Sequence, residues 1–473
     1  MKILKKLMGF SLGPILGAIF SAISVPITTY YLFPNEYGKT SMFNMMYSIL
    51  LMVAYMGYDQ AYIREYHEYE DKSKVLFNSM IVPIFATVVL IIITVCFAPY
   101  ISMFLFESVY YKHVVYMFAS ILPFLMLERF ILVNLRMQEK ALEYSFFSLF
   151  VKLVAFLCTL VFLINIRRDF LAIVYSTLIS HYIGDGILIF LFRKMLRFNR
   201  NMLDKKLIKT MTGFALPLIP ATIAGSVFNA EDKIFIKLLS NYDELGYYQV
   251  SMTLAGMVLI LQQAFSTFWT PMAYRWKNEN VPNEKYEYVQ KTICFISSAC
   301  FMGILLIKNI FPVILSEKYS ATKYILPFLL FYPVMSMMLT TTTIGIDFAR
   351  KTYYSMYFSI AVVIFNFFMN LIFVPLCGAK GAAIATGMSH VFYFAIKTYY
   401  SRKLWFDFEI RHFVNTIVIL SLSALINSLD FIPNNVVYMC DVILILIGIF
   451  CYKDYLIETV NLVKYSRKKD RII

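Results

Sequence analysis

The fold of this chain is indicated by one stretch, residues 114–164, which reads VVYMFASILPFLMLERFILVNLRMQEKALEYSFFSLFVKLVAFLCTLVFLI. Its two apolar runs, Val114–Leu135 and Ala141–Ile164, flank a short polar turn, and each run is long enough as a helix to cross about 30 Å of hydrocarbon. Each run also carries one basic residue near its middle, Arg129 or Lys152. A charge at the centre of a bilayer is costly, so an ionisable residue there is by default a candidate functional residue with a partner to be found.

The same pattern recurs along the whole chain. Of its 473 residues, 60% are apolar and only 15% are charged, and the mean hydropathy is +0.68. No ordinary soluble domain has this composition. We expect an all-α polytopic membrane protein with about fourteen transmembrane helices and no extramembrane domain, and therefore no enzyme. The expected spans are Met8–Tyr31, Thr40–Tyr62, Val75–Phe97, Val114–Leu135, Ala141–Ile164, Leu171–Phe192, Met211–Leu239, Tyr247–Phe268, Tyr288–Ile307, Ile325–Ile344, Tyr353–Val374, Gly381–Tyr399, Phe413–Leu429 and Val436–Tyr452.

The net charge of +14 indicates a membrane topology. If the N-terminus lies in the cytoplasm, alternating spans place most lysines and arginines on the cytoplasmic side, and an even number of spans returns the C-terminus there. Because topology accounts for the charge, a nucleic-acid-binding surface is not indicated. The first span is interpreted as an uncleaved helix rather than a signal peptide. The cysteines show no C-x-x-C spacing, so they indicate small apolar packing residues.

A weak internal repeat divides the chain. Residues 9–12 and 36–38 at the two ends of the first span have counterparts in residues 213–216 and 244–246 of the seventh. Six spans per half would relate the halves by an axis along the membrane normal. We predict an N-terminal six-helix lobe at residues 1–208, a second six-helix lobe at 209–405, and two accessory transmembrane helices with a basic cytoplasmic tail at 406–473.

Prolines interrupt the first span and the seventh at corresponding places. Such matched interruptions are the best sequence pointer to the centre of a transporter, although membrane helices also tolerate prolines. We predict hinges at Pro14, Pro26, Pro217 and Pro220.

Three basic residues are the main candidates for binding substrate. Arg129 and Lys152 lie at similar distances from the turn that joins their spans, and Arg136 follows Arg129 by about two helical turns on nearly the same face. Together they predict a cationic track from the cytoplasm to the membrane centre, which suits an anionic substrate. The alternative is a structural ion pair with Glu128 or Asp185, because buried charges are commonly paired.

Polar faces on two other spans add substrate-binding candidates. In the seventh span, Lys233 shares a face with Asn229, Asp232 and Lys237 by their spacing of i, i+3, i+4 and i+8. This face either contacts substrate or is the wet outer end of the helix. Asp59 and Arg64 lie at the inner end of the second span. They are interleaved with Tyr55, Tyr58, Tyr62 and Tyr66. Aromatic faces with polar neighbours suit sugars, whereas anchoring at the membrane interface is the plainer interpretation.

Four residues are candidates for ion coupling. His181 and Asp185 are one helical turn apart in the sixth span, and a histidine partnered by a carboxylate is easily moved across physiological pH. They predict a proton relay or a coupling-cation site, with a satisfied packing pair as the alternative. Asp232 and Asp347 are further candidates. We expect no cofactor and no resident metal.

Several motifs point to a known family. They are LFPNEYG at 32–38, GYDQAYIREY at 57–66, NAEDK at 229–233, LGYY at 245–248 and the segment 375–383. With these motifs the whole chain resembles the bacterial lipid-linked oligosaccharide flippases, the Wzx-type exporters of O-antigen and capsule repeat units. The resemblance implies the multidrug/oligosaccharidyl-lipid/polysaccharide (MOP) exporter fold, with two six-helix lobes around a central cavity and two accessory helices.

The resemblance also implies a substrate and partners. The substrate is undecaprenyl-diphosphate carrying an oligosaccharide, moved from the inner to the outer leaflet of the bacterial cytoplasmic membrane among membrane lipids. A polysaccharide polymerase and chain-length machinery are the expected partners. Outward movement of such an anion gains roughly 2.3 kcal/mol per charge per 100 mV across an inside-negative membrane, so the potential alone could bias export.

Two other functions compete with this interpretation. A multidrug and toxin extrusion antiporter shares the architecture, but its cationic drugs are opposed by Arg129 and Lys152. A membrane-embedded polysaccharide polymerase or ligase needs catalytic groups on a sizeable outer loop, and every predicted outer connection is short.

Overall fold

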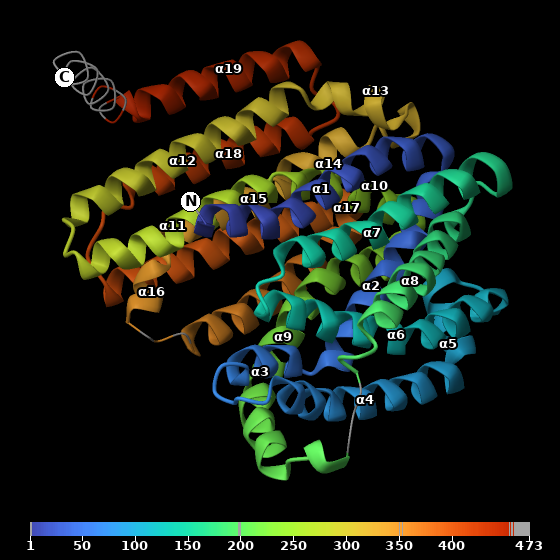
Figure 1. Ribbon diagram of the computed structural model, residues 1–473. Helices are drawn as coiled ribbons and strands as arrows, with labels where there is room; N and C mark the ends of the chain where they lie inside the picture. The colour runs from blue at the N-terminus through green and yellow to red at the C-terminus, as the bar shows by residue number, and fades with distance from the viewer. Residues whose placement is uncertain are drawn as a thin grey trace. The chain divides into compact units, whose positions relative to one another are not determined.

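The computed structural model describes residues 2–196, 200–349, 351, 353–453, 455 and 457, with side chains described for all of these except residues 2–15, 18, 200 and 221. Helices hold 88% of the described residues, and these residues form no β-strand, which confirms the all-α class. Figure 1 shows long helices joined by short connections. The chain divides into two compact units, Met1–Gln249 and Val250–Ile473. The lobe boundary expected after residue 208 stays a prediction.

The number of membrane spans differs from the expectation. Among the described residues, ten helices are long and apolar enough to cross a membrane, or eleven if the bent pair α2 (Pro34–Tyr55) and α3 (Tyr58–Glu65) forms one span. The predicted fourteen are therefore not confirmed. One reason is α17 (Tyr353–Leu404), which contains two of the predicted spans and is interrupted only at Gly378, where φ is 56° and ψ is −129°. Only glycine adopts this conformation readily.

The first unit runs from α1 (Lys2–Tyr31) to the beginning of α10 (Tyr242–Met257). In this unit α1 packs along α7, α7 along α8, and α6 against both α4 and α8. A hydrophobic core that includes Tyr62, Phe130 and Met211 joins α3, α4, α6 and α9. The remaining elements are α4 (Lys72–Cys96), α5 (Ala98–Phe106), η1 (Val109–Tyr111), α6 (Lys112–Met137), α7 (Ala141–Val161), η2 (Phe162–Ile166), α8 (Phe170–Phe192), η3 (Arg200–Met202) and α9 (Lys205–Leu239).

Aspartates begin two helices of this unit. Asp71 caps α4 by accepting a hydrogen bond of 3.0 Å from the backbone N–H of Lys74. Asp204 caps α9 by accepting from the backbone N–H groups of Lys206 and Leu207. Such caps satisfy the first N–H groups of a helix. The Lys74 ammonium lies 2.8 Å from Asp204 and, by its hydrogen bond, lowers the pKa of that carboxyl. The starts of α4 and α9 are thereby held together.

Two glycines of the internal repeat meet where α2 crosses α10. A Cβ on Gly246 would lie 2.0 Å from the carbonyl oxygen of Pro34, and a Cβ on Gly38 would lie 2.2 Å from the carbonyl oxygen of Tyr242. Small residues allow helix backbones to approach this closely inside a membrane. The two repeated segments are therefore packed against each other.

The second unit continues with α11 (Leu259–Asn278) and α12 (Asn283–Leu306) and ends with α19 (Asn434–Cys451). Here α15 packs against α11, α12 and α17, and α18 packs against α12, α14 and α19. Asp441 of α19 is buried and accepts hydrogen bonds from Ser423 (2.6 Å) and Asn427 (2.9 Å) of α18. The other elements are η4 (Lys308–Ile310), α13 (Phe311–Leu315), η5 (Glu317–Tyr319), α14 (Thr322–Leu329), α15 (Phe331–Thr342), α16 (Ile344–Phe348) and α18 (Arg411–Ser428).

The predicted hinge prolines lie inside continuous helices. Pro217 and Pro220 are interior to α9, and Pro26 is interior to α1. The side chain of Pro14 lies outside the described residues. Hinge motion at these positions stays a prediction.

The glycine contact predicts an unequal response of α10 to two alanine substitutions. Gly246→Ala places a methyl group against the backbone of α2, so we expect it to lower the free energy of unfolding by about 1–3 kcal/mol. Gly256→Ala in the same helix meets no atom within 4 Å and should be neutral or slightly stabilising. Thermal unfolding of the purified protein in detergent measures both, and an equal response of the two variants would contradict the assigned crossing.

Candidate functional site

The Arg129 side chain of α6 forms an ion pair with Asp59 of α3. Its Nε donates a hydrogen bond of 3.0 Å to Asp59 Oδ2, and its Nη2 donates to the same oxygen. Gln60 also donates to this oxygen, over 3.1 Å. Two predicted candidates are thus brought together, and the partner of Arg129 is neither Glu128 nor Asp185, the two carboxylates that the sequence suggested.

The ion pair leaves part of the guanidinium free to bind a ligand. The side chain of Arg129 is 40% exposed, whereas that of Asp59 is only 7% exposed. Arginine carries five N–H donors, and Asp59 accepts from two of them. The ring of Tyr55 lies 5.6 Å from the guanidinium, which gives the cation an aromatic neighbour. The remaining donors suit a planar, multidentate acceptor such as a phosphate.

Lys152 of α7 lies against α1. A Cβ on Gly17 of α1 would lie 2.5 Å from the Lys152 ammonium nitrogen, so the glycine makes room for the lysine. Lys152 itself is exposed, and no carboxylate of the described residues forms an ion pair with it. The hydroxyls of Ser148 and Thr159 on the same helix donate to backbone carbonyls of α7. Lys152 is therefore the unpaired cation of the two that the sequence singled out.

The other basic candidates lie outside this pair. Arg136 is exposed near the end of α6. Arg64 of α3 is 60% exposed at its side chain, lies 3.7 Å from Glu65, and stacks over the ring of Phe214 at 4.6 Å. No described contact joins either residue to Arg129.

A second polar cluster lies beside the ion pair and combines three helices. His181 Nδ1 and Asp185 Oδ2, both of α8, are 2.9 Å apart, and His181 Nε2 lies 3.0 Å from the hydroxyl of Tyr47 in α2. Glu128 of α6 completes the cluster, because one ligand atom each from Glu128, His181 and Asp185 lies within 4.8 Å of the others. We call these three residues the carboxylate–histidine cluster.

The carboxylate–histidine cluster has the chemistry of a proton or cation site. Asp185 is fully buried, and its Oδ1 has no hydrogen-bond partner among the described residues. An ionised carboxylate oxygen buried in this way is unfavourable. A shared proton or a bound cation would remove that cost, and His181 between two hydrogen-bond partners can take up or release a proton. Sequence reasoning considered Glu128 only as a partner of Arg129 and did not include Tyr47.

The remaining candidates for ion coupling are separate from this cluster. Asp232 of α9 is buried and accepts a hydrogen bond of 2.6 Å from the hydroxyl of Tyr248. The adjacent Lys233 is half-buried. Because α9 continues to Leu239 and buries Asp232, this region is not a frayed, wet helix end. Asp347 of α16, in the second unit, is exposed.

The tyrosines near Asp59 are packing residues. Tyr58 and Tyr62 are almost fully buried. The hydroxyl of Tyr62 donates to Asn134 over 2.9 Å, and that of Tyr58 lies 2.6 Å from the hydroxyl of Thr212. Neither ring is open to a sugar or to the membrane interface, so both interpretations from the sequence are wrong for these two residues.

Comparison with known proteins gives a family and a fold. A family model described as polysaccharide biosynthesis protein matches residues 3–277. No protein of curated function matches the sequence significantly. The lipid II flippase MurJ in an inward closed conformation has a similar structure, with a TM-score of 0.72 and 17% identity over 96% of this chain and 99% of that one.

Two further solved structures share the fold at lower similarity. An inward-facing multidrug resistance MATE transporter of the MOP superfamily has a TM-score of 0.60 and 15% identity over 84% of this chain and 97% of that one. A MOP superfamily transporter from Pyrococcus furiosus, described as having a binding pocket of reversed polarity, has a TM-score of 0.52 and 16% identity over 84% and 95% of the two chains. These structures show that the fold is the one the resemblance implied.

The ion pair predicts a compensating pair of substitutions. Arg129→Gln leaves the Asp59 carboxylate buried without its cation, so we expect a loss of about 1–3 kcal/mol in the free energy of unfolding. Adding Asp59→Asn should restore most of that loss, because a neutral pair needs no counter-charge. Arg136→Gln, at an exposed position, serves as the control with little effect. Thermal unfolding of the single and double variants in detergent measures these free energies. If the losses of the two single variants simply add in the double variant, Asp59 and Arg129 are not energetically coupled.

Proposed function

The chain belongs to the polysaccharide biosynthesis protein family, and on this premise we propose that it is a flippase for undecaprenyl-diphosphate-linked oligosaccharide repeat units. It moves them from the inner to the outer leaflet of the bacterial cytoplasmic membrane for the synthesis of surface polysaccharide such as O-antigen or capsule. Both termini lie in the cytoplasm. A polysaccharide polymerase and the chain-length machinery take over the product, and the protein itself performs no catalysis.

The observation that carries this proposal is the guanidinium of Arg129, which is fixed by Asp59 yet retains free donors. A diphosphate that carries sugars cannot enter hydrocarbon alone, because unpaired polar groups are costly there. Arg129 offers hydrogen bonds in a fixed direction, and Lys152 adds a positive charge that no described carboxylate neutralises. The polyprenyl tail meanwhile stays in lipid.

Transport proceeds by alternating access of two lobes, as in exporters built from repeats. The lobes correspond to residues 1–208 and 209–405, with two accessory helices in 406–473. Pro26, Pro217 and Pro220 inside α1 and α9 are the proposed bending points. Arg64 and Arg136, both exposed, collect the anionic head group at the cytoplasmic side, and Lys233 contacts it later in the cycle.

The energy source is the membrane potential. A diphosphate with a charge near −2 that moves outward across an inside-negative membrane gains roughly 2.3 kcal/mol per charge per 100 mV. No counter-ion exchange is then obligatory.

One observation favours a second candidate, a cation-coupled antiporter of the multidrug type. The carboxylate–histidine cluster contains two carboxylates beside a histidine, which suits exchange of protons or cations, and the fold is shared with MATE transporters. Arg129 and Lys152 oppose cationic drugs as the cargo. An assay of drug resistance in cells that express the protein separates the two candidates.

Neutralising the unpaired lysine tests the proposed cargo. We expect Lys152→Gln to reduce flipping at least tenfold, because a hydrogen bond from a charged group contributes about 1.5–3 kcal/mol. Lys194→Gln, which removes another exposed charge two residues after the end of α8, is the matched control with normal transport. Transport is measured in two ways: as surface polysaccharide in a flippase-deficient strain that expresses the variant, and as translocation of the lipid-linked oligosaccharide in proteoliposomes. Undiminished transport by the Lys152 variant would remove the support for an anionic cargo.

The energy source is tested with imposed gradients. In proteoliposomes we expect outward flipping to rise with a potential that is negative on the side of entry and to proceed without a pH gradient. His181→Gln should leave this dependence on the potential unchanged. Transport that ignores the potential, follows a proton or sodium gradient, and is lost in His181→Gln and Asp185→Asn would assign coupling to the carboxylate–histidine cluster instead.

A further inference from the structure

A polar cavity of about 470 Å³ opens in the second unit where α18 begins and α19 ends. Its walls include Lys291 of α12, Arg411 and His412 of α18, Lys453 after α19, and Glu409. These residues belong to segments that the charge distribution places at the cytoplasmic side. We therefore expect the cavity at the depth of lipid head groups.

The cationic side chains of this cavity exceed its acidic ones. Lys291 and Glu409 lie 3.3 Å apart and neutralise each other. Arg411 and Lys453 are exposed and form no ion pair with a carboxylate of the described residues. The two ring nitrogens of His412 are buried and have no hydrogen-bond partner among the described residues. Buried polar atoms in proteins normally have a partner, so His412 is a wall residue whose hydrogen-bonding capacity is unused.

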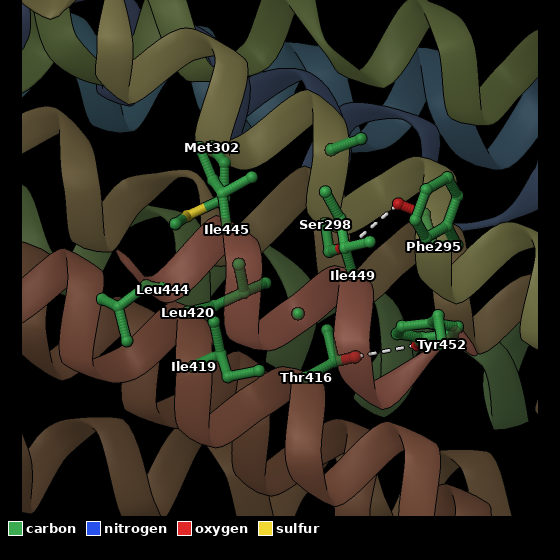
Figure 2. A pocket seen from close by; sticks show the side chains of 12 residues that line it. Phe295, Ser298, Met302, Thr416, Ile419, Leu420, Leu444, Ile445, Ile449 and Tyr452 are labelled. Carbon is green, nitrogen blue, oxygen red and sulfur yellow. Dashed lines mark hydrogen bonds between the residues drawn. The ribbon is translucent and has the colours of Figure 1, made fainter. Parts of the chain in front are cut away.

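An apolar groove of about 140 Å³ lies next to this cavity. Tyr452 lines both the cavity and the groove, and its hydroxyl bonds to that of Thr416 over 2.8 Å. Figure 2 shows the groove walls, with Met302 and Phe295 of α12, Leu420 of α18 and Ile449 of α19 around one space.

The groove has open space beside Gly448. A Cβ added to Gly448, which lines the groove, would meet no atom within 4 Å. The groove thus has room for part of a hydrocarbon chain beside a polar cavity that favours an anion.

We propose that the cavity and groove together bind one anionic phospholipid of the inner leaflet. Its phosphate lies between Arg411, Lys453 and His412, and part of one acyl chain occupies the groove beside Gly448. Basic pockets between transmembrane helices on the cytoplasmic side are typical sites for anionic head groups. The lipid would bridge α12, α18 and α19 and so fasten the accessory helices. This site is independent of the proposed transport function.

The test measures lipids bound to the purified full-length protein by native mass spectrometry and by thermal unfolding in detergent. We expect phosphatidylglycerol to bind and to raise the unfolding temperature, whereas phosphatidylcholine and inorganic phosphate do neither. Arg411→Gln with Lys453→Gln should weaken phosphatidylglycerol binding roughly 30-fold, since each basic side chain near the membrane contributes about 1 kcal/mol. The matched pair Lys285→Gln with Lys403→Gln, exposed and outside the cavity, should bind normally.

A second variant tests the groove without touching the charges. Gly448→Leu fills the space for the acyl chain and should also weaken phosphatidylglycerol binding. Equal binding of phosphatidylcholine and phosphatidylglycerol to the unaltered protein would overturn the proposal without any variant. If inorganic phosphate alone stabilises the protein, the site binds anions in general. If undecaprenyl phosphate displaces phosphatidylglycerol and binds more tightly, the site is part of the substrate path. Both results would overturn a phospholipid site.

Discussion

Inside a membrane a charged side chain must meet an opposite charge or several hydrogen bonds, and the pair of Asp59 and Arg129 meets this constraint in the first unit. The pair joins α6 to α3, a short helix that is bent by 45° from α2. Asp59 is buried, so its carboxylate depends on the guanidinium. In turn the carboxylate fixes the direction of the remaining guanidinium donors. A structural ion pair and a binding site for an anion are therefore compatible in the same residue.

Two adjacent residues of α6 belong to different polar networks. Successive residues point about 100° apart on a helix, so Arg129 faces Asp59 of α3 while Glu128 joins His181 and Asp185 of α8. This separation keeps the cation away from the carboxylate–histidine cluster. It gives the first unit one site suited to an anion and another suited to protons or cations.

Close packing and polar bonds between helices stabilise each of the two units separately. Gly38 and Gly246 let α2 and α10 approach until their backbones nearly touch. Lipid offers no hydrophobic driving force for helix association, so close van der Waals packing of this kind stabilises the contact instead. In the second unit, Asp441 binds two side chains of α18, and the buried ammonium of Lys308 donates to the carbonyl of Asn427 over 2.8 Å. A phospholipid between α12, α18 and α19 would add to these polar bonds at the other end of the same helices.

The sequence by itself determined the membrane class, the helical fold and the position of Arg129 and Lys152 within their spans, because apolar length and spacing along one helix are local properties. The pairing of His181 with Asp185 was predictable for the same reason, since the two residues share one helix face. Only the tertiary structure decided that Asp59 is the partner of Arg129, that Glu128 joins His181, and that Tyr58 and Tyr62 are core residues. Those contacts connect residues on different helices, and the register and rotation of packed helices depend on side-chain fit across the interface, which no single span encodes.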